Sequence, residues 1–141
     1  MIKNLVRDWM SPRLLTIGPK TSLHDAHAMM KDNHVRRLPV VDDGKLAGIV
    51  TLADVLQAEP SKATTLSIFE LNYLLAKVTI DEIMTHDVVT VQAAANIRDA
   101  AKIMLEHDVS GLPVLDGAAM VGMITESDIF RALIEAPEEA D

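Results

Sequence analysis

The 141-residue sequence contains no cysteine, which excludes disulfide bonds and thiolate metal ligands and favours a reducing compartment. It also lacks any apolar run approaching the about 18 residues that a membrane span needs. The N-terminus meets Lys3, Arg7 and Asp8 before a long apolar core could form, which does not fit a secretory signal. We therefore expect a cytoplasmic protein without a membrane partner.

Basic residues are outnumbered, since 13 lysines and arginines face 21 aspartates and glutamates and give a formal net charge of −8. This balance disfavours a sequence-independent grip on nucleic acid or on an anionic membrane, because both need a basic face. An anionic ligand would need a local positive patch, and the sequence offers one candidate, His34-Val35-Arg36-Arg37.

The patterns of catalytic centres are missing as well. No glycine-rich phosphate loop occurs, and no serine stands in the glycine-framed turn that exposes a nucleophile. Catalysis is therefore the least supported class, and we expect a protein that is not an enzyme.

What the chain does contain is an internal duplication. Leu38-Pro39-Val40-Val41-Asp42 recurs 74 positions later as Leu112-Pro113-Val114-Leu115-Asp116, and the hydrophobic fraction of 49% is that of a packed globular protein. The same register holds over the rest of both copies. It matches Met10 with Met84, Thr16 with Thr90, Asp25 with Asp99, Met30 with Met104, Gly48 with Gly122, Thr51 with Thr125 and Asp54 with Asp128.

Each copy reads as a βαββα unit, which opens in the first copy with a short predicted strand around Thr16-Ile17. Ser22 and Asn96 are N-cap candidates for helices with apolar residues at helical spacing. A hairpin follows, with Asp43-Gly44 at its turn in the first copy, while Asp116-Gly117 sits one residue earlier in the second, so the two turns are expected to differ. We predict an α/β (α+β) fold of two βαββα repeats packed with pseudo-twofold symmetry, because neither short sheet would be stable alone.

The predicted boundaries are residues 1–58 for the first repeat, 59–77 for a connecting linker, 78–134 for the second repeat and 135–141 for a disordered acidic tail. In the linker, Ser67 and Glu70 form a capping box at the start of a predicted helix. The apolar residues that follow predict that this helix packs against the module or a partner.

These residues resemble a known family, the paired cystathionine-β-synthase (CBS) domain or Bateman module. The resemblance lies in the stretches Gly48–Asp54 and Gly122–Asp128, in the two Leu-Pro-Val motifs and in the openings Met10-Ser11 and Met84-Thr85. It covers the chain from about Val6 to Arg131, and the linker resembles that of acetoin-utilisation-type CBS proteins.

The resemblance implies a regulatory module that senses an adenine nucleotide (AMP, ADP or ATP) in the clefts between its repeats, with no required cofactor and with or without Mg²⁺. In the family, the aspartate of the signature bonds ribose hydroxyls and the threonine three residues before it supports ribose or phosphate. Here these are Thr51 and Asp54 in one repeat and Thr125 and Asp128 in the other.

The family also builds its base pocket across the repeat boundary. By resemblance, the cleft of Thr51 and Asp54 receives Thr90, Val109 and Ser110, and the cleft of Thr125 and Asp128 receives Thr16, Val35 and Arg36. Phosphate-binding positions are Arg36 and Arg37 in the first repeat but Ser110 and Gly111 in the second. We therefore expect unequal clefts, with the nucleotide held more tightly at Thr51 and Asp54, and AMP or ADP held more easily than ATP unless Mg²⁺ is bound.

Plainer interpretations stay open beside these. The threonine and aspartate pairs would cap helices whatever their function, and His24, Asp25 and His27 are better explained as an exposed helix face than as metal ligands. The alternative functions are a ligand-free dimerisation or adaptor module for a partner protein and an S-adenosylmethionine sensor. We also expect a homodimer, because apolar helix faces remain uncovered, and a regulated protein that the sequence does not identify.

Overall fold

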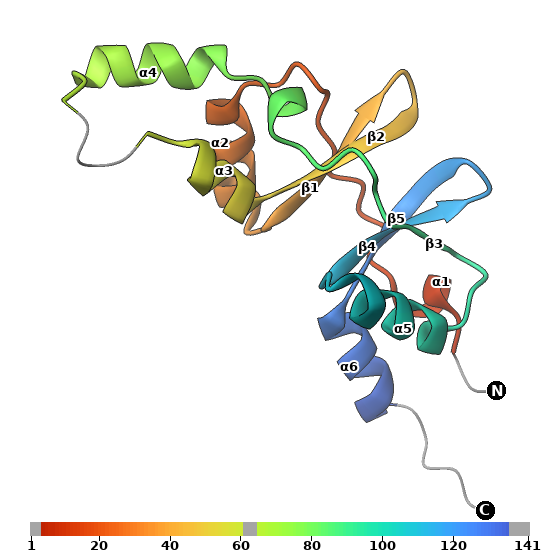
Figure 1. Cartoon of the computed structure of the whole chain (residues 1–141). Coiled ribbons are helices and arrows are strands. Elements are labelled where there is room, and N and C mark those ends of the chain that lie inside the picture. Colours follow the sequence, from red (N-terminus) through yellow and green to blue (C-terminus); the bar gives the residue numbers. More distant parts are fainter. Residues whose placement is uncertain (1–3, 61–64, 136–141) are drawn as a thin grey trace, which may run out of the picture. The chain divides into compact units, whose positions relative to one another are not determined.

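The structure is a computed structural model that describes residues 4–60 and 65–135, and Figure 1 shows the whole chain as a ribbon. The chain divides into two compact units. We call Leu15–Val88 the first-repeat unit, and Met1–Leu14 together with Val89–Asp141 the second-repeat unit. Both contain helices and strands, so the predicted α+β class and the two repeats are confirmed.

The first-repeat unit is a two-stranded antiparallel sheet with helices. Its strands β1 and β2 pair with Arg37 opposite Thr51, and the opening strand predicted at Thr16 is reduced to a single parallel bridge between Ile17 and Val40. Its elements are α2 (Leu23–Asn33), β1 (Arg37–Asp42), β2 (Lys45–Thr51), α3 (Leu52–Ala58), α4 (Ile68–Lys77) and the 3₁₀ turn η1 (Ile80–Glu82).

The second-repeat unit has the same plan with one strand more. The opening strand β3 pairs in parallel with β4, which pairs antiparallel with β5, and Gly111 stands opposite Thr125. Its elements are α1 (Val6–Trp9), β3 (Val91–Gln92), α5 (Ile97–His107), β4 (Gly111–Asp116), β5 (Ala119–Thr125) and α6 (Glu126–Glu135). Of the predicted acidic tail, only Glu135 lies within the described residues.

The predicted helix starts are confirmed in both repeats. Ser22 Oγ accepts a hydrogen bond from the Asp25 N–H at 3.1 Å, and Asn96 Oδ1 accepts one from the Arg98 N–H at 2.8 Å. These bonds satisfy backbone donors that the first turn of a helix leaves unpaired. Each unit then buries the apolar face of its helix against its own sheet in a separate core.

The two hairpins turn differently, as the offset of their glycines predicted. In the first, both loop residues are left-handed, with φ of 51° at Asp43 and 77° at Gly44, as a type I′ turn requires. In the second, the loop is Gly117 and Ala118, and only Gly117 has a positive φ, of 63°. That pattern belongs to a type II′ turn, so one residue of offset changes the turn without changing the strands it joins.

The repeats exchange their opening segments. Val6, at the start of the first repeat, is fully buried in the core of the second-repeat unit, and Ile80, its counterpart 74 residues later, is fully buried in the core of the first-repeat unit. Backbone hydrogen bonds fix both exchanges, because Ser11 pairs with Met123 and Thr85 pairs with Ile49. Each compact unit therefore contains the opening segment of the other sequence repeat.

Two glycines permit this exchange. A Cβ on Gly48 would lie 2.5 Å from Met84 Sδ and 2.8 Å from the Thr85 carbonyl oxygen. A Cβ on Gly122 would lie 2.5 Å from the Ser11 carbonyl oxygen. Only glycine lets the exchanged backbone approach the strand so closely.

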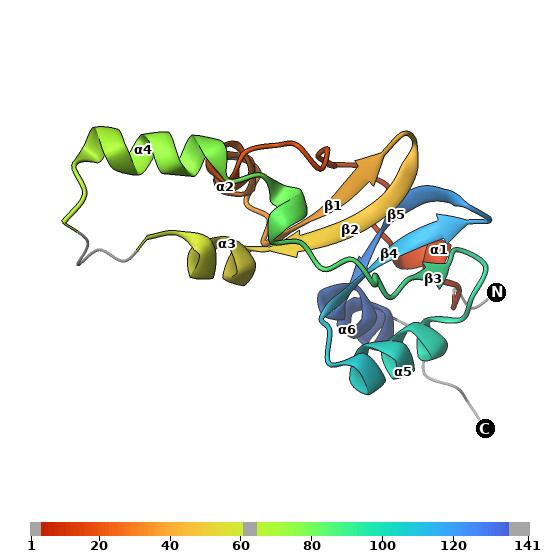
Figure 2. The ribbon, with the colours of Figure 1, turned by 45° about the horizontal axis from the view of Figure 1, so that its top comes forward.

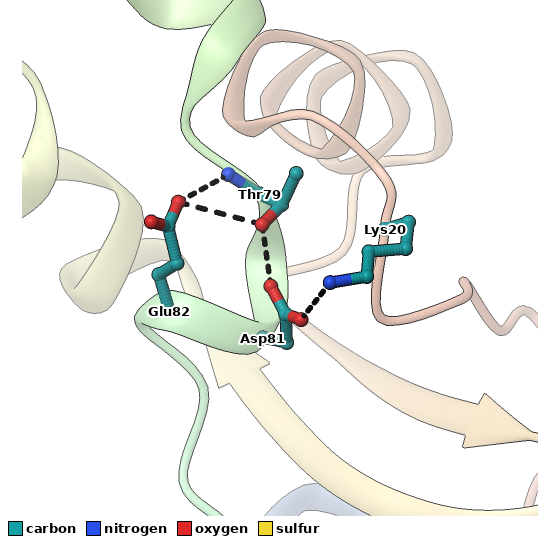
Figure 3. Close-up of polar contacts among 4 residues, drawn as sticks. All are labelled: Lys20, Thr79, Asp81 and Glu82. Carbon is teal, nitrogen blue, oxygen red and sulfur yellow. Dashed lines mark hydrogen bonds and ion pairs between the residues drawn. The ribbon is translucent and has the colours of Figure 1, made fainter.

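A polar cluster fixes the exchanged segment of the first-repeat unit (Figure 3). Lys20 Nζ forms an ion pair with Asp81 Oδ2 at 2.8 Å, and the Thr79 hydroxyl donates to the other oxygen of Asp81. The Thr79 N–H donates to Glu82 at 2.8 Å. The hydrogen bond from Lys20, followed by that from Thr79, lowers the pKa of Asp81, and the hydrogen bond to Asp81 raises the pKa of Lys20.

The C-terminal end of the linker helix α4 lies near α2 in both views, and the rest of the helix extends away from α2 (Figures 1 and 2). Its predicted capping box is present, because Ser67 Oγ accepts from the Glu70 N–H at 3.2 Å and donates to the Glu70 carboxylate at 3.1 Å. Leu75 packs on the core of the first-repeat unit, but Phe69 and Tyr73 are 83% and 60% exposed. No residue of α4 is fully buried, and only Leu71 and Leu75 are half-buried. The side of the helix opposite these two leucines is apolar and uncovered among residues 4–60 and 65–135.

Candidate functional site

Thr51 and Asp54 form a reciprocal capping box at the start of α3. The Thr51 N–H donates to Asp54 Oδ2 at 2.9 Å, and the Asp54 N–H donates to Thr51 Oγ1 at 3.2 Å. The plainer interpretation as a helix cap is thus confirmed for this pair. Asp54 is only half-buried, and its Oδ1 has no partner among residues 4–60 and 65–135, so one carboxylate oxygen stays available to a ligand.

Thr125 and Asp128 occupy the matching place at the start of α6, but their carboxylate is used differently. Asp128 Oδ2 accepts from the Thr125 N–H at 2.9 Å and from the Thr125 hydroxyl at 3.2 Å. Its Oδ1 accepts from Nη2 of Arg131, and the residue is only 6% exposed. Both oxygens of Asp128 are engaged, whereas the counterpart of Arg131 in the first repeat is Gln57.

The first-repeat unit places Arg36 and Arg37 directly beside its own capping box. Arg37 pairs with Thr51 across the hairpin, and the Arg36 carbonyl oxygen accepts from the Leu52 N–H at 2.8 Å. Arg36 is exposed and Arg37 is half-buried. Val35 packs at the edge of the core, and Thr16 lies half-buried just before the bridge of Ile17.

The second-repeat unit has the same backbone here without the charges. The Ser110 carbonyl oxygen accepts from the Glu126 N–H at 3.0 Å, and Gly111 takes the place of Arg37 opposite Thr125. Val109 and Thr90 are half-buried in irregular segments on either side of α5. That these residues are shared across the repeat boundary stays a prediction.

A cavity of about 370 Å³ opens next to the α3 start of the first-repeat unit. His34, Val35 and Arg36 in its wall belong to the positive patch predicted from the sequence, whereas His27 and Lys31 were not predicted as part of it. The signal was present, because positions 27, 31 and 34 follow one face of a helix at i, i+4 and i+7. The cavity is lined by His27, Met30, Lys31, His34, Val35, Arg36 and Leu52.

The histidine group predicted as an exposed helix face is only partly so. His24 and Asp25 are exposed, but His27 is half-buried and its Nδ1 lies 2.5 Å from Glu59 Oε1 at the end of α3. This correction follows from the packing of α3 on α2, which the sequence of α2 alone does not show. Within residues 4–60 and 65–135, no group of three or more His, Cys, Asp or Glu side chains is placed to hold a metal ion.

No helix in the described part of the chain has the length and apolar character needed to cross a membrane. Two βαββα repeats, each with a threonine-aspartate box at the start of its last helix, define a tandem-repeat module. The chain belongs to the CBS domain family, which matches residues 6–61 and 80–135.

Relatives agree with this assignment over nearly the whole chain. A CBS domain-containing protein of Dictyostelium discoideum is 37% identical over 139 residues, which are 97% of this chain and 96% of that protein. An uncharacterised protein of Methanocaldococcus jannaschii is 33% identical over 135 residues, which are 93% of this chain. The match covers only 32% of that relative. Some relatives are enzymes, such as an inosine-5′-monophosphate dehydrogenase of Korarchaeum cryptofilum, of which the match covers 22%.

Solved structures show the same fold. CBSX2 in complex with AMP has a TM-score of 0.77 at 31% identity, covering 94% of this chain and 98% of that one. The CBS domain pair of protein MJ0100, with 5′-methylthioadenosine and S-adenosyl-L-methionine, has a TM-score of 0.76 at 31% identity, covering 94% and 97%. A putative acetoin utilization protein from Vibrio cholerae has a TM-score of 0.76 at 30% identity, covering 95% and 92%.

Proposed function

We propose that this chain is a non-catalytic regulatory module that binds an adenine nucleotide between its two CBS repeats. The observation that supports this most directly is the Asp54 carboxylate oxygen without a partner among residues 4–60 and 65–135, at a helix start whose backbone pairs with that of Arg36 and Arg37. A carboxylate can accept from both vicinal hydroxyls of a ribose, and guanidinium groups are suited to phosphate oxygens. Solved CBS pairs with AMP, or with 5′-methylthioadenosine and S-adenosyl-L-methionine, support an adenosine-containing ligand.

The proposed binding residues are those predicted from the sequence. Asp54 and Thr51 would hold the ribose, and Arg36 and Arg37 would meet the phosphate. The base pocket of this cleft would be formed by residues of the other repeat, Thr90, Val109 and Ser110. The second cleft would combine Thr125 and Asp128 with Thr16, Val35 and Arg36. Because both oxygens of Asp128 are already engaged, we propose the cleft at Asp54 as the tighter of the two.

The regulated protein would be a separate chain or domain, and the cytoplasm is the proposed compartment because the chain has no cysteine. A bound nucleotide would bias the packing of the repeats by no more than its difference in affinity for their arrangements. Mg²⁺ would enter only with ATP, whose extra charge it would offset.

Thermal unfolding of the chain with and without millimolar AMP, ADP, ATP and S-adenosylmethionine tests this function. A ligand that binds only the native state must raise the midpoint temperature of unfolding. At a ligand concentration a hundred times its Kd, the free energy of unfolding rises by about 2.7 kcal/mol. If none of the four ligands shifts the midpoint, the proposal fails and a ligand-free dimerisation or adaptor module takes its place. If only S-adenosylmethionine shifts it, the chain is an S-adenosylmethionine sensor.

We also propose that the uncovered side of α4 pairs with the α4 of a second copy. Leu66, Phe69, Glu70, Tyr73 and Leu74 line a shallow groove of about 520 Å³ along this side. In an antiparallel pair centred between Tyr73 and Leu74, Glu70 of each helix would lie opposite Lys77 of the other. The face is thus complementary to itself in charge as well as apolar, which supports a homodimer over an unrelated partner.

A further inference from the structure

Both hairpins have an Asp-Gly pair at the tip. Asp43-Gly44 lies between β1 and β2, Asp116-Gly117 lies between β4 and β5, and all four residues are exposed. An aspartate side chain can react with the main-chain nitrogen of the next residue, and it does so most readily before glycine, because glycine has no Cβ to hinder the approach. The two tips therefore share a reactive pair, and they differ in what surrounds the glycine nitrogen.

The tip of the second repeat is clamped by a side chain from the opening strand. The Gly117 N–H donates to Gln92 Oε1 at 3.0 Å, and Gln92 Nε2 donates to the Gly117 carbonyl oxygen at 3.1 Å. The parallel pairing of β3 with β4 places Gln92 beside Leu115, close to this tip. Because two hydrogen bonds must open before the peptide can rotate, the Gly117 nitrogen is shielded as a nucleophile.

The tip of the first repeat lacks this clamp. The counterpart of Gln92, 74 positions earlier, is Gly18, which has no side chain to reach the turn. The Gly44 N–H has no hydrogen-bond partner among residues 4–60 and 65–135. Asp43 is also held in the left-handed conformation with φ of 51°, which is unfavourable for a residue with a Cβ, whereas Asp116 is the last residue of a strand. The first tip is therefore free to leave its native conformation.

We propose that Asp43 is a site of spontaneous conversion to isoaspartate and that Gln92 protects Asp116 from the same reaction. The Gly44 nitrogen attacks Cγ of the protonated Asp43 carboxyl group. A bond between nitrogen and Cγ closes a succinimide ring, and the carboxyl hydroxyl leaves as water with the amide proton. Water then opens the ring at the former main-chain carbonyl carbon of Asp43. Gly44 stays bonded to Cγ, and no atom is gained or lost overall.

The product changes the hairpin and creates a new chemical group on it. The main chain becomes one carbon atom longer within a two-residue loop whose type I′ geometry matches the twist of the strands. The former main-chain carboxyl group of residue 43 becomes a free carboxylate on an exposed tip. A carboxylate of this kind is the substrate of methyltransferases that act on isoaspartyl residues. The partner class of the first hairpin is therefore an isoaspartyl carboxyl methyltransferase, whether or not the chain binds a nucleotide.

Ageing of the full chain at neutral pH tests the selectivity between the tips. Tryptic digestion and electron-transfer mass spectrometry measure isoaspartate at each position. In the folded chain, position 43 should isomerise about tenfold faster than position 116, because the clamp on Gly117 must open first. In urea, where the clamp is lost, the two rates should become similar. Equal rates in the folded chain, or no isoaspartate at position 43, would overturn the inference.

Replacing Gln92 tests the clamp itself. Gln92→Met removes both hydrogen bonds with an unbranched side chain of similar length, so it should raise the rate at position 116 about tenfold and leave position 43 unchanged. Gln57→Met makes the same change at an exposed position of α3 and should alter neither rate. If the difference between the tips persists in urea at its full size, the neighbouring residues and not Gln92 set it, and the inference is wrong.

Enzymatic labelling gives a second readout that does not depend on Gln92. An isoaspartyl methyltransferase with a radiolabelled methyl donor should label the aged wild type. Asp43→Glu should lose most of this label, because the longer side chain would have to close a larger ring. Asp116→Glu should keep it. A label of equal size in Asp43→Glu and the wild type would show that isoaspartate forms elsewhere in the chain and would reject the site.

Discussion

Arg131 donates from Nη2 to Asp128 Oδ1, and the first repeat has Gln57 where this arginine stands. This single difference separates two carboxylates that the repeat register makes equivalent. Asp128 is 6% exposed and both of its oxygens are engaged, while Asp54 caps its helix with one oxygen and the other has no partner in the described part of the chain. The same side chain therefore contributes mainly to stability in one repeat and is available for binding in the other.

The first prediction is that binding and stability respond oppositely to the two alanine substitutions. Asp54→Ala should weaken nucleotide binding more than Asp128→Ala, because only Asp54 has an unengaged oxygen. Asp128→Ala should cost more free energy of unfolding, about 2–3 kcal/mol against about 1 kcal/mol, because it removes a buried, multiply bonded carboxylate. Calorimetry and urea denaturation measure the two effects.

A matched variant controls for this comparison. Arg131→Gln reproduces the arrangement of the first repeat, so it should lose only a modest part of the stability that Asp128→Ala loses, since the helix cap is kept. A stronger loss of nucleotide binding in Asp128→Ala than in Asp54→Ala would reject the assignment of the tighter cleft.

The second prediction concerns the exchanged opening segments. Gly48→Ala should lower the free energy of unfolding by about 1–3 kcal/mol, because its Cβ would meet Met84 Sδ at 2.5 Å and the Thr85 carbonyl oxygen at 2.8 Å. Gly18→Ala is the control, since nothing lies within 4 Å of the Cβ it would add. Equal unfolding midpoints for the two variants in urea would show that the segment does not pack on Gly48.

The third prediction is a pH dependence set by Lys20 and Asp81. The pKa of Asp81 is lowered, so its contribution is complete above the unfolded carboxyl value of about 3.9 and disappears as pH falls through the lower folded value. The pKa of Lys20 is raised, so its contribution is complete below about 10.4 and disappears as pH rises through the higher folded value.

Asp81→Asn should therefore destabilise the chain at neutral pH and converge with the wild type in acid. Lys20→Met should converge with the wild type at both extremes, because both partners are needed for the ion pair. Urea denaturation between pH 3 and pH 11 measures this, because the ordinary pKa values of the two groups, about 4 for aspartate and about 10 for lysine, lie within that range. A constant difference between Asp81→Asn and wild type at all pH values would contradict the role of the ion pair.

The fourth prediction concerns the uncovered side of α4. Phe69→Glu should convert a dimer into a monomer at micromolar concentration, because Phe69 is 83% exposed in the chain and would be buried in the pair. Asn72→Glu, which adds the same charge elsewhere on α4, should leave the dimer intact. Light scattering gives the mass in each case.

Charge reversal tests the proposed antiparallel register of the same helices. Glu70→Lys and Lys77→Glu should each weaken the dimer, and the double variant should recover much of the loss, since opposite charges would again face each other. A wild-type chain that scatters as a monomer would reject the α4 pair altogether.

The local structure was largely predictable from the sequence because its signals are local. Ser22 and Asn96 cap their helices as expected, and the one-residue offset of Gly117 changed the hairpin turn as expected. The repeat register also gave the position of both capping boxes. What the sequence could not show were bonds between residues far apart in the chain.

The exchange of the opening segments is the clearest of these. Nothing in the sequence near Val6 indicates that it is buried against the second repeat. Gly48 was recognisable as part of a motif, but the sequence did not show that the close approach of the exchanged segment requires glycine there. The bond of His27 with Glu59 likewise joins residues 32 positions apart. The opening strand at Thr16 was overestimated, because an extended segment becomes a strand only if enough of a neighbour pairs with it.

The exchange has a consequence for any cut made in the chain. Cleavage in the linker between α3 and α4 would separate each opening segment from the core in which it is buried. Each fragment would carry the opening segment of the other fragment's core and lack the one that its own core needs. Each fragment would then expose the strand beside Gly48 or Gly122, with unpaired backbone groups that only the missing segment satisfies. The two fragments should therefore associate when they are mixed in solution. The module should reassemble from fragments that do not fold separately.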